Sequence, residues 1–232
     1  MLINNIDISK FKAKLLERSI QNSDFEVNSL WLDNSREPFI DKNFNYKFKK
    51  LSFKLDLICK DSNELEVIKS NLTKELATAT IKFDDIDFYY RGSVTGDISV
   101  NYIMQGNETL DINMLVVAES KEIVDYMNGI LSKNINNKGN LEIPIVLEIT
   151  PTIAMIELNI QGLSEFPIII KNLELNKKVI IDGELSKVTQ ENINKFKDID
   201  LWEFPRLLPG NNTISLSRNN CNITIKYKER WI

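Results

Sequence analysis

The chain has 232 residues, a mass of 26.8 kDa, 43% hydrophobic residues and a formal net charge of −4. This is enough apolar material for one large or two ordinary folded domains. The sequence contains no histidine, which argues against most hydrolase triads and zinc sites. Its acidic balance, with a pI near 5.2, disfavours tight binding of DNA or RNA.

The sequence lacks recognisable targeting signals, and its two cysteines do not form a disulfide or metal-binding pattern. No run of eighteen apolar residues occurs, and the first residues lack the basic-then-apolar plan of a signal peptide. We therefore expect synthesis and assembly in the cytoplasm, without membrane insertion. Cys59 and Cys221 each lie in an apolar alternating run, so we expect two buried free thiols.

The first half of the chain predicts strands around one packed helix. Residues 47–59 alternate with period two, which places Leu51, Phe53, Leu55 and Leu57 on one face of a strand. Asp61 and Glu64 form a capping box, and four apolar residues then follow at helical spacing: Leu65, Ile68, Leu72 and Leu76. A helix is therefore expected directly after the strand.

Residues 94–117 predict a long antiparallel hairpin that turns at Gly106-Asn107. The first arm has Ile98, Val100, Tyr102 and Met104 on one face, and the second has Leu110, Ile112, Met114 and Val116. After it, Ile123, Met127 and Ile130 lie at helical spacing within residues 121–131, which predicts a short amphipathic helix before a polar stretch. This composition change suggests two domains, residues 1–130 and 131–232.

The second half predicts an antiparallel sandwich, because short strands recur with turns between them. Strands are expected over residues 142–149, 156–160 with Ile156, Leu158 and Ile160 on one face, 166–170 and 179–181. Asp182-Gly183 is the strongest two-residue hairpin signal in the chain. Near the end, Pro209-Gly210 suits a type II turn and Asn219-Asn220 a second turn, which predicts a closing hairpin whose last strand lies inside a sheet.

Candidate chemistry is sparse. Asp84, Asp85 and Asp87 supply oxygen ligands for Ca²⁺ or Mg²⁺, but they lack the glycine and distal glutamate of a calcium loop, which favours a solvated turn. The aromatic residues 88–90 are more typical of core packing than of a stacking site. Phosphate-binding glycine loops are absent, so we assign no catalytic, cofactor-binding or metal-binding residue and expect a protein that is not an enzyme.

Three segments carry a resemblance to a known family. The run from Phe204 through Pro209-Gly210 to Ile214, followed by residues 223–227 and the terminal Arg230-Trp231, resembles the C-terminal signature of phage distal tail proteins (Dit). The acidic and aromatic residues 83–91 are similar to a strand of that family's first domain. Residues 137–149, which begin with an NxG segment, are similar to the start of its second domain.

The resemblance implies a mainly β fold: an N-terminal barrel-like β domain with one packed helix and a long hairpin, and a C-terminal galectin-like antiparallel β-sandwich. It implies a structural protein at the virion tail tip, a homo-oligomer in a hexameric ring that connects the tail tube to the tail-tip hub. The expected partners are the tail-tube protein, the hub or tail-associated lysin, and receptor-binding components. DNA would pass through a mildly negative channel without being retained.

Two alternatives stay open. A carbohydrate-binding module would recognise cell-wall glycan through exposed aromatics such as Trp31 or Tyr90. Trp202 and Trp231 instead fall in the structural motif, and Trp231 is expected to anchor the chain end. A glycoside hydrolase would need two carboxylates that converge in space, and nothing in the sequence singles out such a pair.

Overall fold

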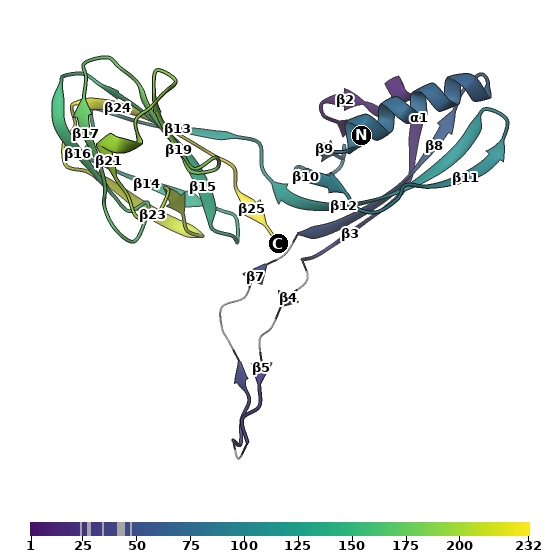
Figure 1. The fold of residues 1–232 in the computed structure, drawn as a ribbon, viewed down its shortest axis with the longest axis horizontal. Helices are drawn as coiled ribbons and strands as arrows, with labels where there is room; N and C mark the ends of the chain where they lie inside the picture. Colours follow the sequence, from purple (N-terminus) through teal and green to yellow (C-terminus); the bar gives the residue numbers. More distant parts are fainter. Residues whose placement is uncertain (24, 27–28, 34, 41–44, 47) are drawn as a thin grey trace. The chain divides into compact units, whose positions relative to one another are not determined.

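The computed structural model describes all residues except 24, 27–28, 34, 41–44 and 47. The chain forms two compact units, one of Met1–Glu119 with Ile232 and one of Ser120–Trp231 (Figure 1). Both are built mainly from antiparallel strands, which confirms the predicted fold class.

The first unit combines strands with one short 3₁₀ helix and, among its described residues, one α-helix. The elements are β1 (Leu2–Ile3), β2 (Ile6–Asp7), η1 (Ile8–Phe11), β3 (Ala13–Gln21), β4 (Phe25–Glu26), β5 (Ser29–Leu30), β6 (Phe39–Ile40), β7 (Asn45–Tyr46), β8 (Lys49–Ile58), α1 (Ser62–Leu76), β9 (Ala79–Lys82), β10 (Tyr89–Val94), β11 (Ser99–Met104) and β12 (Asn107–Glu119).

Its main sheet has the order β2-β1-β9-β10-β12-β8-β3, and β11 pairs with the first part of β12. Beyond β3 and β8, strand β4 pairs with β7 and β5 pairs with β6. The predicted strand is confirmed as β8, and its four inward residues Leu51, Phe53, Leu55 and Leu57 are buried. Lys47, where that strand was expected to begin, lies outside the described residues.

Helix α1 covers one face of this sheet (Figure 1). The Asp61 carboxylate accepts a hydrogen bond from the Glu64 backbone N–H at 2.9 Å, and the Glu64 carboxylate accepts one from the Lys60 N–H at 2.8 Å. These bonds satisfy N–H groups at the start of the helix. Leu65, Leu72 and Leu76 are buried against the sheet, so the predicted capping and apolar stripe are confirmed.

The predicted hairpin is confirmed as β11 and β12, with the turn one residue earlier than expected, at Gln105-Gly106. Gly106 has φ +79°, and a Cβ there would lie 2.7 Å from the Cys59 carbonyl oxygen. Glycine is therefore required both by the backbone conformation and by the close approach.

The second unit is a sandwich of two antiparallel sheets around a separate core. Its elements are β13 (Ile123–Asn128), β14 (Ser132–Asn137), β15 (Ile143–Pro151), β16 (Met155–Gln161), β17 (Ile168–Leu173), β18 (Val179–Asp182), β19 (Lys187–Gln190), β20 (Ile193–Asn194), η2 (Phe196–Asp198), β21 (Ile199–Asp200), β22 (Arg206–Leu207), β23 (Gly210–Leu216), β24 (Cys221–Tyr227) and β25 (Arg230–Trp231). One sheet has the order β13-β24-β15-β18-β19-β20, and the other β14-β23-β16-β17-β21.

The helix predicted over residues 121–131 is wrong, because this segment contains strand β13. Strand β13 pairs with β24 from Ile123–Tyr227 to Asn128–Asn222, and Met127 is buried in the sandwich core. The helical spacing of three apolar residues was outweighed by sheet pairing over a segment too short for a stable helix. Residues 120–130 thus pack with the second unit, and the units divide earlier than residue 130.

The closing hairpin predicted at the C-terminus is also wrong. Strand β23 pairs with β14 and β16, whereas β24 pairs with β13 and β15, so residues 217–220 cross from one sheet to the other. Both strands alternate toward the same core, and the sequence pattern is identical for a hairpin and for a crossing between facing sheets. The expectation that the last long strand lies inside a sheet is confirmed by β24.

Two local predictions need correction. Strands β18 and β19 do pair as a hairpin, but residues 183–186 connect them, with the Asp182 carboxylate accepting from the Glu184 and Leu185 N–H groups at 2.9 Å. Gly183 instead allows a close approach, since a Cβ would lie 2.6 Å from the Pro205 carbonyl oxygen. Ile156 is 83% exposed, because Met155 occupies the core position that alternation assigned to it.

Candidate assembly surfaces

The acidic turn after β9 is a set of ion pairs. Asp84 pairs with the N-terminal ammonium at 2.8 Å, Asp87 lies 3.9 Å from Lys82, and Asp85 accepts from both Arg18 guanidinium nitrogens. The hydrogen bonds from Arg18 lower the pKa of Asp85 to about 2. Among the residues that the structure describes, no group of acidic or cysteine side chains is arranged to hold a metal ion.

The aromatic strand that follows belongs to the core of the first unit. Tyr90 is only 3% exposed, and its ring meets Phe83 edge-on with 5.9 Å between centroids. The Arg18 guanidinium lies over the other ring, 4.6 Å from the Phe83 centroid. Tyr90 is therefore unable to stack on a glycan, whereas Trp31 is 64% exposed.

The PGxN segment, residues 209–212, forms a turn that leads into β23. Gly210 has φ +86°, the conformation that a type II turn demands of its third residue. The Asn212 side chain is buried and bonds the turn on both sides: it accepts from the Leu208 N–H at 2.9 Å and donates to the Leu208 and Gly210 carbonyl oxygens at 2.8 and 2.9 Å.

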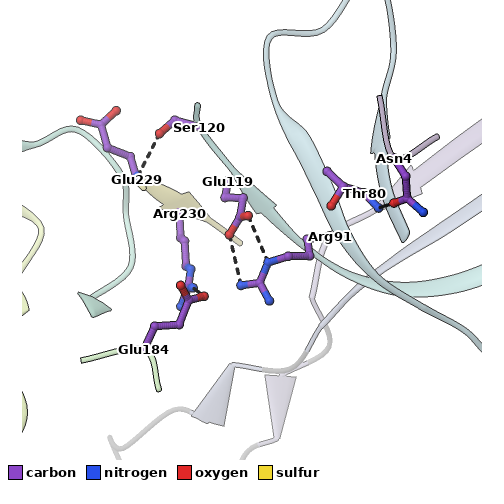
Figure 2. Close-up of polar contacts among 8 residues, drawn as sticks. All are labelled: Asn4, Thr80, Arg91, Glu119, Ser120, Glu184, Glu229 and Arg230. Carbon is purple, nitrogen blue, oxygen red and sulfur yellow. Dashed lines mark hydrogen bonds and ion pairs between the residues drawn. The ribbon is translucent and has the colours of Figure 1, made fainter. Parts of the chain in front are cut away.

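The end of the chain is tied to the NxG segment. Glu229 is buried, its carboxylate accepts from the Lys138 N–H at 2.9 Å, and its N–H donates to the Ser120 hydroxyl at 3.0 Å (Figure 2). Arg230 donates to the Glu184 carboxylate at 3.0 Å, and a Cβ at Gly139 would lie 2.5 Å from the Arg230 carbonyl oxygen. These contacts explain why the terminal residues are ordered structure and not a frayed tail.

Figure 2 also shows two contacts inside the first unit. The Arg91 guanidinium donates to both carboxylate oxygens of Glu119 at 3.1 and 3.3 Å, which holds the buried last residue of β12. The Asn4 side chain accepts from the Thr80 N–H at 2.9 Å and so joins the first turn of the chain to β9.

Strand β11 is an open edge with an apolar surface. All six of its residues are exposed, including Val100, Ile103, Met104 and Tyr102, the last by 71%. Among the described strands β11 pairs only with β12, so its outer N–H and C=O groups face away from the sheet. Monomeric proteins protect such edges with charges, and residues 98–107 contain none.

Strand β3 forms the other open edge of the same sheet, and among the described strands it pairs only with β8. The segment β11-β12-β8-β3 is antiparallel throughout, so β11 and β3 run in opposite directions. A second copy could therefore place its β11 beside β3 as an ordinary antiparallel neighbour. The alternating pattern predicted β11 as a strand, but it did not show that the apolar face of this strand is exposed.

The face of this segment that points away from α1 is polar and balanced in charge. Lys54 lies 3.5 Å from Asp111 on the neighbouring strand, and the Ser52 hydroxyl donates to Asn113 at 2.7 Å. Glu17 and Lys54 are register partners of β3 and β8, as are Lys14 and Asp56. Part of the face is a shallow hollow of about 160 Å³ lined by residues of β3, β8 and β12.

The two tryptophans of the C-terminal sequence motif differ in their exposure. Trp231 is half-buried, in keeping with an anchor, but Trp202, which falls in the same sequence motif, is 84% exposed. Its neighbours Leu201 and Phe204 pack on the sandwich core and leave the indole outside. Cys221 is buried and free as expected, whereas Cys59 is only half-buried. No helix in the described part of the chain has the length and apolarity to span a membrane.

The combination of a sheet with one helix and an antiparallel sandwich is a fold found in known phage tail proteins. The crystal structure of SPP1 Dit, described as a paradigm of the hub adsorption apparatus in phages that infect Gram-positive bacteria, matches with a TM-score of 0.77 at 12% identity, over 100% of this chain and 98% of that one. Two structures of the activated phage p2 baseplate, with Sr and with Ca, match with TM-scores of 0.58 and 0.56 at 13% and 12% identity, over 96% of this chain and 92% of theirs.

Residues 138–231 match the family model described as siphovirus-type tail component, C-terminal domain. The second unit is thus similar to this family of phage tail components, and the predicted resemblance to distal tail proteins is confirmed. No curated protein matches the chain.

Proposed function

We propose that the chain is a structural protein that forms a ring at the distal end of a phage tail and connects the tail tube to the tail-tip hub. The observation that carries this proposal is the agreement of both units together with a known distal tail protein, over the whole length of each chain. The family match of the second unit supports the same assignment.

The two open edges of the first unit supply a mechanism for ring closure. Strand β11 of one copy would add to β3 of the next, and repetition of this heterologous contact closes a ring when the rotation between copies divides a full turn. The apolar side chains Val100, Tyr102 and Met104 would become buried at that contact. Six copies are the number that the family resemblance implies.

A ring built through these edges would turn one face of the segment β11-β12-β8-β3 toward its lumen. The polar face is suited to a channel for DNA, because its lysines are paired with carboxylates such as Asp111 and do not form a continuous cationic track. The net charge of the chain alone would suggest a mildly negative lumen. If this face lines the lumen, its paired charges would make the lumen nearly neutral.

The remaining parts of the proposal concern partners and location. The ring would bind the tail-tube protein on one side and the hub or tail-associated lysin on the other, with receptor-binding components on the outer sandwiches. It would act at the virion tail tip after assembly in the host cytoplasm, and without catalysis.

Native mass spectrometry of the purified chain tests ring formation. We expect a closed oligomer of six for the native protein and monomers for Tyr102→Asp, because a carboxylate in the strand contact would be buried without a partner. Ile193→Asp is the matched control, since Ile193 is equally exposed but lies in the sandwich. Monomers of the native chain, even with tail-tube and hub proteins present, would contradict the proposal.

A further inference from the structure

Two exposed aromatic rings stand together at one end of the sandwich. Phe166, in the connection between β16 and β17, is 50% exposed, and Trp202, just after β21, is 84% exposed. Their ring centroids are 5.9 Å apart and the rings are inclined by 45°. Neither ring belongs to the core, whereas Leu163 is buried in it and Phe204 packs against it.

The backbone holds this aromatic pair in place. Strands β17 and β21 are antiparallel neighbours in the sheet, and Ile169 lies opposite Asp200. The connection before β17 and the connection after β21 therefore lie at the same end of these strands. The Arg206 N–H donates to the Leu163 carbonyl oxygen at 2.8 Å, and the Ser164 hydroxyl donates to the Phe166 carbonyl oxygen. A platform held in this way loses little entropy when a ligand stacks on it.

Charged residues with hydrogen-bonding groups of both kinds lie near the two rings in the sequence or pair with residues that do. Arg206 bridges two carboxylates, Glu203 at 2.9 Å and Glu142 at 3.1 Å, and Glu165 lies beside Phe166 in sequence. Carboxylates accept hydrogen bonds from hydroxyl groups, and the guanidinium donates to hydroxyl oxygens. Acids outnumber bases here, which is unfavourable for a polyanion such as a nucleic acid.

The size of the surface argues against a protein partner. Two aromatic side chains present about 150–250 Å² each, and a stable protein interface requires about 800 Å² from each partner. Of the residues directly beside the rings in the sequence, Glu165 and Glu203 are charged, Leu201 packs on the core and Pro167 is exposed. A charge therefore interrupts the apolar area on one side of each ring.

We propose that Trp202 and Phe166 form a stacking platform for the pyranose rings of a neutral polysaccharide. The apolar C–H face of a sugar ring would lie on the indole and its hydroxyls would reach Glu203 and Arg206. This site is independent of ring closure, which uses strands of the other unit, and it differs from the Trp31 and Tyr90 sites suggested by the sequence.

The test is titration of the full chain with neutral hexaoses of glucose, galactose and N-acetylglucosamine, followed by calorimetry and saturation-transfer NMR. At least one hexaose should bind, and Trp202→Ala should weaken it roughly tenfold, as expected for loss of one stacking contact. Phe166→Ala should weaken it less, and Trp202→Phe should retain most of the affinity. Trp31→Ala, the matched control at another exposed tryptophan, should bind like the native chain.

Poly(glycerol phosphate) serves as the anionic probe and should not bind. The proposal is overturned if no hexaose binds, or if Trp202→Ala binds as tightly as the native chain. It is also overturned if Trp202→Ala abolishes incorporation of a receptor-binding protein into tails while no hexaose binds, because the rings would then be a protein contact. Native mass spectrometry of Trp202→Ala should give the same oligomer as the native chain, which separates this result from failure of the ring.

Discussion

Strands β11 and β24 share the same alternating sequence pattern but differ in the burial of their apolar side chains. In β11 the alternating residues Val100, Tyr102 and Met104 are exposed, whereas in β24 Ile223, Ile225 and Tyr227 are buried between two sheets. β24 has a strand on each side, and β11 has one neighbour among the described strands. Alternation therefore predicts a strand, but whether its apolar face is covered by the same chain or by another copy is decided by topology.

The largest expected effect on stability comes from a cavity-forming substitution in the buried strand β24. Ile225→Ala should lower the free energy of unfolding by about 2–5 kcal/mol, because it leaves a cavity in the sandwich core. Tyr102→Ala, at the open strand, should stay within about 0.5 kcal/mol when measured on monomers. Urea unfolding measures both, and equal losses would mean that β11 is covered within its own chain.

A smaller loss is expected at the turn that leads into β23. Asn212→Ala should cost about 1–3 kcal/mol, because it removes a buried side chain that makes hydrogen bonds to the Leu208 N–H and carbonyl groups. Asn211→Ala, its exposed neighbour, is the control and should be nearly neutral. If the two variants unfold alike, the hydrogen bonds of Asn212 do not hold the turn.

Elements with local sequence signals were predictable, whereas pairing between distant segments was not. Strand β8, helix α1 and the β11–β12 hairpin were predictable, because their alternation, capping box and turn residues are local signals. The crossing between β23 and β24 was not, since strands in one sheet and strands in facing sheets bury the same residues. The exposure of Tyr102 and Trp202 was also not predictable from the sequence, because the surroundings of a side chain depend on pairing between distant segments.

The smallest expected effect concerns the ion pair over the first core. The folded-state pKa of Asp85 is about 2, below its ordinary value of 3.8. The unfolded chain therefore binds more protons between these values, and stability falls as pH decreases through this window. Thermal unfolding followed from pH 5 to pH 2 should show less pH dependence in Asp85→Asn than in the native chain.

Hydrogen exchange, read by mass spectrometry on the assembled and the monomeric protein, tests the central claim most directly. If β11 of one copy pairs with β3 of the next, amides of residues 99–104 and 13–21 should exchange more slowly in the oligomer than in monomeric Tyr102→Asp. Amides of residues 221–227 should exchange equally in both, because β24 is already paired on both sides. An oligomer in which residues 99–104 exchange as fast as in the monomer would contradict the account.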